Sequence, residues 1–245
     1  MPAGTPTILA TSGGLRPGTR SEIVFAPLLL HAIELAGVDG RAPRLCHVGT
    51  ADGDQRWFQA WFSEAGREAG VDVSHLSLFP MPNVSDVTGF LLAHDAVWVS
   101  GGSVANLLAL WRLHDLVQSF RQAWEAGVVL TGVSAGSVCW HAGGTTDSFG
   151  PDLRPVTNGL GFLPCSNGVH YDSEAQRRPL FQSLIAHGTL PEGYATDDGV
   201  GLLYRGTQMT EALTEVPGQG AYRVTRDGDQ AREERIEPRV LPGAA

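Results

Sequence analysis

Short apolar segments that alternate with helical segments constrain the fold of this chain more than any other feature. Strands are predicted at residues 6–11, 44–48, 73–79, 96–99 and 128–130. Helices are predicted at 21–35, 54–69, 86–92, 104–124 (with a break near 114) and 175–187. Continuous apolar strands connected through helices are typical of a parallel sheet that is buried on both faces. The sequence therefore predicts an α/β fold, with a mostly parallel sheet flanked by helices on both faces.

The rest of the chain is less regular. Residues 143–167 are rich in Gly, Thr, Pro and Asp and predict loops, whereas the chain from 199 onward predicts short strands and turns. We expect one α/β domain over residues 1–231 and a charged, Pro-containing, frayed tail over 232–245. Four aromatic residues of the helix at 54–69 predict a core-facing stripe: Trp57, Phe58, Trp61 and Phe62.

Composition excludes several function classes. The net charge of −9 argues against nucleic-acid partners, which require basic patches. All 17 basic residues are arginine, which excludes Schiff-base chemistry and a P-loop lysine. The sequence has no long uncharged apolar run and no signal-like start, so we expect neither a membrane span nor secretion. A cytoplasmic location is also favoured by three widely spaced cysteines, Cys46, Cys139 and Cys165.

The strongest chemical signal is Gly132-Val133-Ser134-Ala135-Gly136, which fits the G-x-S-x-G nucleophile elbow. A predicted strand precedes it, and a helix is expected after it. Such a turn exposes the serine hydroxyl, and the N–H of the next residue, Ala135, can donate to an oxyanion. We expect Ser134 to be a nucleophile. The alternative is a purely structural turn.

A serine nucleophile needs a base, and the base needs a carboxylate that orients it. His170 lies in the loop 167–172 after the glycine-rich stretch and is favoured as the base, with His141 as its rival. Spacing alone does not choose among the candidate acids Asp147, Asp152, Asp172, Asp197 and Asp198.

Three motifs together resemble the peptidase E (aspartyl dipeptidase) family of serine peptidases, family S51, which also includes cyanophycinase. They are Ser100-Gly101-Gly102 with Leu107, the elbow continued to Ser137, and the segment 168–172 with Arg177. The resemblance extends from about residue 8 to about residue 204. It implies a class I glutamine amidotransferase-like fold, which is a flavodoxin-like three-layer sandwich. It also implies a homodimer and a reaction that uses no cofactor and no metal.

The resemblance assigns roles residue by residue. Ser134 matches the family nucleophile, His170 the base, and Gly102 an oxyanion-hole donor that works with the Ala135 N–H; Gly101 is expected beside the substrate. The acid is implied to be Asp198, within Thr196-Asp197-Asp198-Gly199-Val200. In other members the acid follows the serine more closely, and there Asp147 is the match.

Family substrates are dipeptides with an N-terminal aspartate or, in cyanophycinase, a β-aspartyl-arginine polymer. The resemblance therefore implies a serine exopeptidase that acts on small peptides through an acyl-enzyme. An arginine suits the aspartate side chain because its guanidinium matches a carboxylate bidentately. Arg177 and Arg178 are the candidates. This chain has His-Tyr-Asp-Ser-Glu at 170–174, where the aspartyl dipeptidases have a different, longer segment.

Three other hypotheses fit the residues less well. An α/β-hydrolase esterase would use the order Ser134, Asp147, His170, but no HGGG-type motif is present and the span is short. An amidotransferase-like binding domain would leave Ser134 inert. A metal site at His170 and Asp172, near His187, lacks a second ligand cluster.

Overall fold

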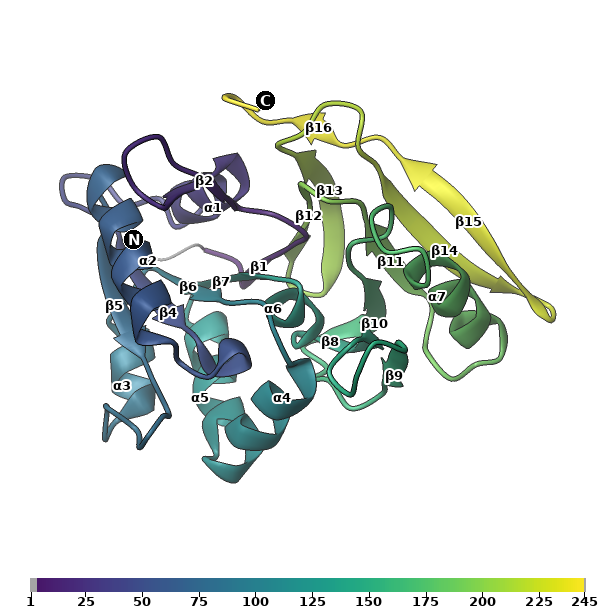
Figure 1. Ribbon diagram of the computed structural model, residues 1–245, viewed down its shortest axis with the longest axis horizontal. Helices are drawn as coiled ribbons and strands as arrows, with labels where there is room; N and C mark the ends of the chain where they lie inside the picture. Colours follow the sequence, from purple (N-terminus) through teal and green to yellow (C-terminus); the bar gives the residue numbers. More distant parts are fainter. Residues whose placement is uncertain (1–3, 245) are drawn as a thin grey trace.

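The computed structural model describes residues 4–244 and contains two main sheets with helices packed against them (Figure 1). The larger sheet has the strand order β16-β13-β12-β1-β7-β6-β4-β5. In that order the strands span Arg239–Val240, Gln208–Thr214, Val200–Arg205, Thr7–Thr11, Val129–Val133, Ala96–Val99, Arg44–Val48 and Asp72–Leu76. The strands from β1 to β5 in this order are parallel, and β12 pairs antiparallel with β1.

Helices cover both faces of the parallel strands because alternate side chains point to opposite faces. Helices α1 (Pro27–Glu34) and α2 (Arg56–Glu68) pack on the face that carries Leu45 and Trp98. Helices α3 (Val87–Leu92), α4 (Val104–Leu113) and α5 (Leu116–Glu125) pack on the face that carries Cys46 and Val97. The sequence prediction of an α/β fold with helices on both faces is therefore confirmed.

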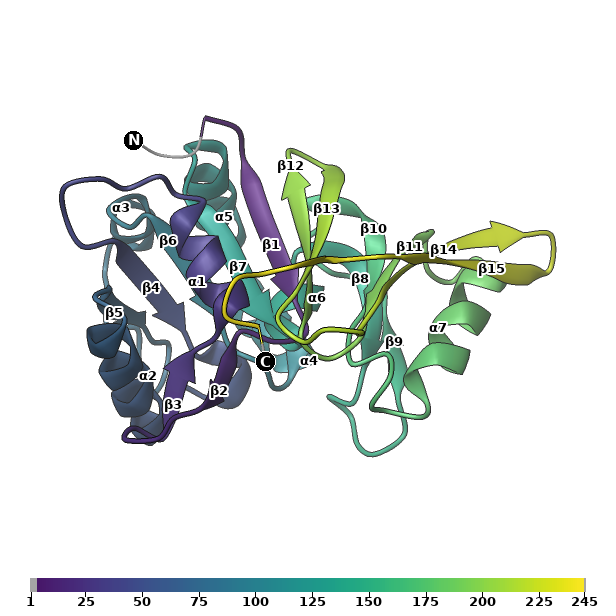
Figure 2. The ribbon, with the colours of Figure 1, turned by 90° about the horizontal axis from the view of Figure 1, so that it is seen from above.

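The second sheet has the order β15-β14-β11-β10-β8-β9. In that order its strands span Gln230–Ile236, Ala221–Asp227, Gly193–Thr196, Leu163–Gly168, His141–Thr146 and Arg154–Val156. Seen from above, β12 and β13 lie between the parallel strands and this sheet, while α7 (Arg177–Ala186) packs on its outer strands (Figure 2). The remaining elements are the hairpin β2 (Leu15–Pro17) and β3 (Ile23–Phe25), the 3₁₀ turn η1 (Thr50–Asp52) and α6 (Ala135–Val138).

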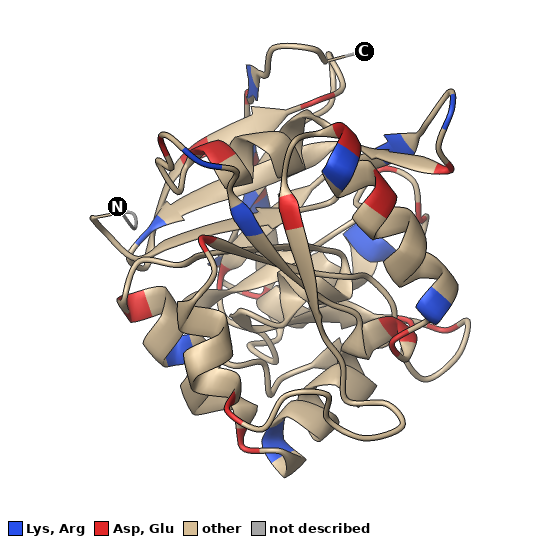
Figure 3. Ribbon diagram, turned by 90° about the vertical axis from the view of Figure 1, so that its left-hand side faces the viewer, with Lys and Arg blue, Asp and Glu red and all other residues tan. Residues whose placement is uncertain are grey.

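On the side of the molecule that Figure 3 shows, acidic and basic residues are interspersed along the helices and strands. Within residues 4–244, none of the helices combines the length and the apolar composition that crossing a membrane requires.

Several sequence predictions were wrong in instructive ways. The segment 21–35 is not one helix, because residues 23–25 pair with β2 and Pro27 starts the helix. The segment 143–167 is only partly loop: Gly143 and Gly144 lie in β8, where a Cβ on Gly143 would stand 2.1 Å from the Val156 carbonyl oxygen, whereas Gly150, Gly159 and Gly161 lie in the loops between the strands. Of the four aromatics expected in the core, only Phe62 is fully buried, and Trp57 is 54% exposed.

The expected frayed tail was also wrong. Residues 230–236 form β15, which pairs antiparallel with β14 around the turn at Gly228, and β16 pairs with β13. The charged residues of β15 concealed the strand in the sequence because they replace the usual apolar alternation. One prediction made from the same pattern was correct: the break near His114 separates α4 from α5.

A buried histidine connects β4 to its neighbours. His47 is 1% exposed, its Nδ1 lies 2.9 Å from Nδ1 of His75, and its Nε2 lies 2.8 Å from the Ser100 hydroxyl. Burial, with a smaller contribution from the charge of His75, lowers the pKa of His47 to about 3. The folded protein therefore holds this imidazole neutral directly behind the Ser100 turn.

Core packing around Trp111 predicts a large stability effect. Trp111 is fully buried, stacks on Phe120 at a centroid distance of 4.1 Å, and donates to the Thr50 hydroxyl. Trp111→Ala should lower the free energy of unfolding by about 3–5 kcal/mol, because it leaves a cavity. Leu113→Ala, on the same helix at a residue that is 76% exposed, should change it by less than about 0.5 kcal/mol. Urea denaturation measures both, and equal effects would contradict this view of the core.

The histidine pair predicts a pH dependence of stability. The unfolded chain protonates His47 near its ordinary pKa of about 6.5, whereas the folded protein does so only near pH 3. Stability should therefore be lost as the pH falls through that window. In His47→Gln, the slope of unfolding free energy between about pH 7 and 5 should be shallower, by up to about 1.4 kcal/mol per pH unit. Denaturation at several pH values measures this, and identical slopes in both proteins would argue against it.

Candidate active site

Ser134 lies at a sharp turn between β7 and α6. Its φ of 55° and ψ of −113° are strained for a residue with a side chain, and its N–H donates to the Thr11 carbonyl at 3.1 Å. The elbow glycines permit this path, because a Cβ on Gly136 would stand 2.1 Å from the Val99 carbonyl oxygen. The helix that follows is only four residues long. The serine is nevertheless placed at the helix N-terminus, as the elbow motif indicates.

The turn after β6 brings Gly101 and Gly102 to the same place. A Cβ on Gly101 would lie 3.3 Å from the Ser134 Cβ, so there is no room for a side chain that stays clear of the serine. Gly102 has a φ of 130° and lines the same small cavity as Ser134 and Ala135. Within residues 4–244, neither the Gly102 N–H nor the Ala135 N–H has a hydrogen-bond acceptor. Two backbone donors are thus free at the cavity that contains the serine.

The parallel pairing of β10 with β11 brings His170 and Asp198 together, because both follow strand ends at one edge of the second sheet. Nδ1 of His170 lies 2.5 Å from Oδ1 of Asp198. The His170 N–H donates to the Ser12 hydroxyl at 3.3 Å, next to Thr11, which holds Ser134. Between the described side chains of Ser134 and His170 there is no direct hydrogen bond; such bonds are often long before substrate binds.

The other candidate acids have different surroundings. Asp147 lines the cavity of Ser134, but in the described part of the chain its carboxylate makes no hydrogen bond to His170. Asp172 accepts the Asp198 N–H at 2.8 Å, and Asp197 accepts from the Gly220 N–H and the Tyr222 hydroxyl. Burial raises the pKa of Asp197. Asp172 and Asp197 therefore hold the backbone around Asp198, a role that the sequence did not suggest.

The two candidate arginines point in different directions. Arg177 is 2% exposed, lines the cavity of Ser134 and donates to the Thr145 carbonyl at 2.8 Å. Arg178 instead pairs with Glu233 on β15 and lies over the rings of Tyr171 and Tyr222. Only Arg177 is placed to meet a molecule at Ser134, and Arg178 fastens α7 to the β14–β15 hairpin.

The rival base and the metal hypothesis find no support in the geometry. His141 is fully buried and hydrogen-bonded to the Ser137 carbonyl and the Tyr204 hydroxyl, and burial lowers its pKa to about 4. His187 is engaged with the Ser183 carbonyl of its own helix. Across the described residues, no three His, Cys, Asp or Glu side chains converge as a metal-ligand set.

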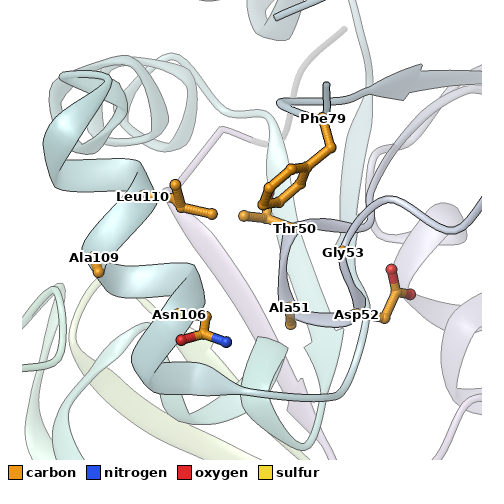
Figure 4. Close-up of a pocket in the computed structure, with 8 residues that line it drawn as sticks. All are labelled: Thr50, Ala51, Asp52, Gly53, Phe79, Asn106, Ala109 and Leu110. Atoms are coloured by element: carbon orange, nitrogen blue, oxygen red, sulfur yellow. The ribbon is translucent and has the colours of Figure 1, made fainter. Parts of the chain in front are cut away.

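A second pocket, of about 470 Å³, lies between η1 and α4 (Figure 4). Phe79 and Leu110 face each other at one end of it, and Asp52 and Asn106 lie toward the other end. Burial raises the pKa of Asp52 to about 6. Ala51, which lines this pocket, packs directly on Gly102, so the glycine turn lies between this pocket and Ser134.

Comparisons with known proteins agree on one family. The model of Peptidase family S51 matches residues 8–212. The uncharacterized peptidase YgaJ of Bacillus subtilis (strain 168) is 42% identical over 182 residues, which are 74% of this chain and 78% of that protein.

Two solved structures share the fold. A peptidase from an acI-B1 actinobacterium has a TM-score of 0.65 at 15% identity and covers 96% of this chain and 95% of its own. A putative peptidase E protein from Listeria monocytogenes EGD-e has a TM-score of 0.58 at 14% identity and covers 96% and 100%. The chain shares its fold with both structures, which confirms the α/β fold class expected from the resemblance.

Proposed function

Because this chain belongs to peptidase family S51, we propose that it is a serine exopeptidase that hydrolyses small peptides through an acyl-enzyme. The observation that carries the proposal is the contact between His170 and Asp198 next to the strained elbow of Ser134. A buried arginine in the same cavity supports an acidic side chain on the substrate.

In the proposed mechanism, Ser134 attacks the scissile carbonyl and His170 takes the serine proton. Asp198 accepts a hydrogen bond from Nδ1 of His170, which keeps Nε2 free to act as the base. The same imidazole then protonates the leaving amine, and a water molecule hydrolyses the acyl-enzyme. The N–H groups of Gly102 and Ala135 stabilise the oxyanion, each typically by about 3 kcal/mol.

The proposed substrates are dipeptides with an N-terminal aspartate, whose side chain would meet the Arg177 guanidinium. This assignment is supported by the position of Arg177 in the Ser134 cavity, with Gly101 at its edge. The cavity has a volume of only about 10 Å³ in this structure, so binding of a dipeptide requires the side chains that line it to move apart. A cyanophycinase-like β-aspartyl peptidase is the second candidate, since its substrates offer a carboxylate at a similar place.

The proposal also includes a homodimer, on the strength of the family resemblance alone, and a cytoplasmic location, which the three widely spaced cysteines favour. Light scattering of the purified protein tests the dimer.

The proposed catalytic roles predict a ranking of variants. Ser134→Ala should abolish turnover, and Asp198→Asn should lower kcat by about 10³–10⁴-fold because the imidazole loses the partner that orients it. Asp147→Asn should retain most activity. The measurement is hydrolysis of Asp-Leu, with circular dichroism to check folding. The reverse ranking of the two aspartates would assign the acid to Asp147, and residual activity of Ser134→Ala within tenfold of wild type would exclude Ser134.

The proposed substrate class predicts a difference between neighbouring arginines. Arg177→Gln should lower kcat/KM for Asp-Leu by about 10–100-fold, since charge-assisted hydrogen bonds contribute about 1.5–3 kcal/mol. It should affect Ala-Leu and Leu-Leu much less. Arg178→Gln is the matched control and should leave this selectivity unchanged. The panel includes β-Asp-Leu and Glu-Leu: cleavage of β-Asp-Leu alone would favour the cyanophycinase-like activity, and equal losses in both variants would argue against Arg177.

A further inference from the structure

Arg177 already has a carboxylate partner in this structure. Its Nε lies 2.8 Å from Oε2 of Glu174 and its Nη2 lies 3.0 Å from Oε1, a bidentate pair. Its Nη1 donates to the Thr145 carbonyl. A guanidinium has five N–H donors, and these contacts use three of them. Among the described residues, one N–H on each terminal nitrogen has no acceptor, so the group is occupied but not saturated.

We propose that Glu174 is an internal competitor for the substrate carboxylate, and that its hold on Arg177 sets how strongly the site prefers acidic side chains. This inference rests on the proposed function and adds to it a residue that determines specificity. Glu174 was not suggested by the sequence, where it was only part of a segment that differs from the aspartyl dipeptidases.

When no substrate is bound, the buried guanidinium of Arg177 needs a counter-ion. A guanidinium that is 2% exposed is costly without a counter-ion, because burial removes it from water. Glu174 supplies that counter-ion when no substrate is bound. An arriving carboxylate either replaces Glu174 or shares the two free N–H groups with it, and in both cases the negative charge of Glu174 opposes binding.

The Glu174 carboxylate is free to leave Arg177. Its side chain is 40% exposed, whereas that of Arg177 is 3% exposed. The backbone of Glu174 is held by the Arg177 N–H, which donates to the Glu174 carbonyl at 2.9 Å, so a change of side-chain rotamer can move the carboxylate into water while the backbone stays in place. The exchange of one carboxylate for another keeps the buried guanidinium paired throughout.

The charge around the Ser134 cavity also opposes an acidic ligand. Asp147 lines it together with Arg177. With Glu174 in place, these three groups sum to one negative charge, which disfavours an acidic ligand. Neutralising Glu174 brings the sum to zero, so only ligands with a carboxylate side chain should gain affinity.

The chain contains a matched control for this pair. Arg178 and Glu233 also form a bidentate ion pair, with Nε and Nη2 at 3.2 and 2.9 Å from the carboxylate oxygens. Arg178 is next to Arg177 in the sequence, but its guanidinium lies over Tyr171 and Tyr222 and does not line the cavity of Ser134. Glu233→Gln therefore removes the same kind of interaction without changing the charge of the site.

The test measures binding by calorimetry, with L-aspartate and L-asparagine as the probes, in a Ser134→Ala background. Adding Glu174→Gln should tighten L-aspartate by roughly tenfold and L-asparagine by less than about twofold. Adding Glu233→Gln should change neither. Glu174→Asp, whose shorter side chain reaches Arg177 less well, should give an intermediate result, and thermal melting checks that each variant is folded.

The outcomes separate this inference from the proposed function. Unchanged L-aspartate binding in Glu174→Gln and Glu174→Asp, or an equal gain for L-asparagine, would overturn the role of Glu174. Failure of the enzyme with Ser134 intact to hydrolyse any dipeptide would overturn the proposed function instead. Tighter L-aspartate binding in Glu174→Gln, together with no dipeptide hydrolysis by the enzyme with Ser134 intact, would support the role of Glu174 and contradict the proposed peptidase reaction.

Discussion

The site depends on the end of strand β1, where two consecutive residues hold the three segments of the proposed triad. Thr11 accepts the Ser134 N–H through its carbonyl and donates its hydroxyl to the Gly132 carbonyl. The Ser12 hydroxyl accepts the His170 N–H and lies 2.7 Å from the Thr196 hydroxyl. Ser12 is 4% exposed, so these bonds are shielded from water. The first sheet thus provides the elbow, and the buried Ser12 hydroxyl is one of the groups that fix the second sheet against it, together with the His141–Tyr204 hydrogen bond.

This anchoring explains how the site tolerates strain. Ser134 and His170 have positive φ values of 55° and 53°, a conformation that non-glycine residues adopt at an energetic cost. Each is held by a hydrogen bond from its own N–H to the end of β1, and the Tyr171 N–H adds a bond to the Thr196 carbonyl. The sheets impose the conformation, and the side chains at the turn are presented to the cavity as a result.

Local patterns were predictable from the sequence, and features that depend on the approach of distant segments were not. The elbow could be identified because five consecutive residues determine it. The strands at 141–168 were missed, because their glycines are needed where Val156 and Asn167 pass closely, which only the fold reveals. Arg177 and Arg178 could not be separated, because neighbouring residues lie about 100° apart around a helix and its orientation was unknown. The choice between them follows from the packing of α7.

The turn between His170 and α7 connects the proposed base with the residue proposed to bind the substrate side chain, yet its two ends are held very differently. At the His170 end, Ser12 accepts the His170 backbone N–H, Asp198 fixes the imidazole, and Asp172 fixes the backbone of Asp198. At the other end, Glu174 is attached to His170 by a backbone bond of 3.3 Å and to Arg177 by a backbone bond of 2.9 Å and by its partly exposed carboxylate. Movement of Glu174 can therefore proceed without displacing the base. The Glu174 carboxylate can thus be exchanged for another at Arg177 while the proposed triad keeps its geometry, because the hydrogen bonds of His170 to Ser12 and Asp198 do not involve it.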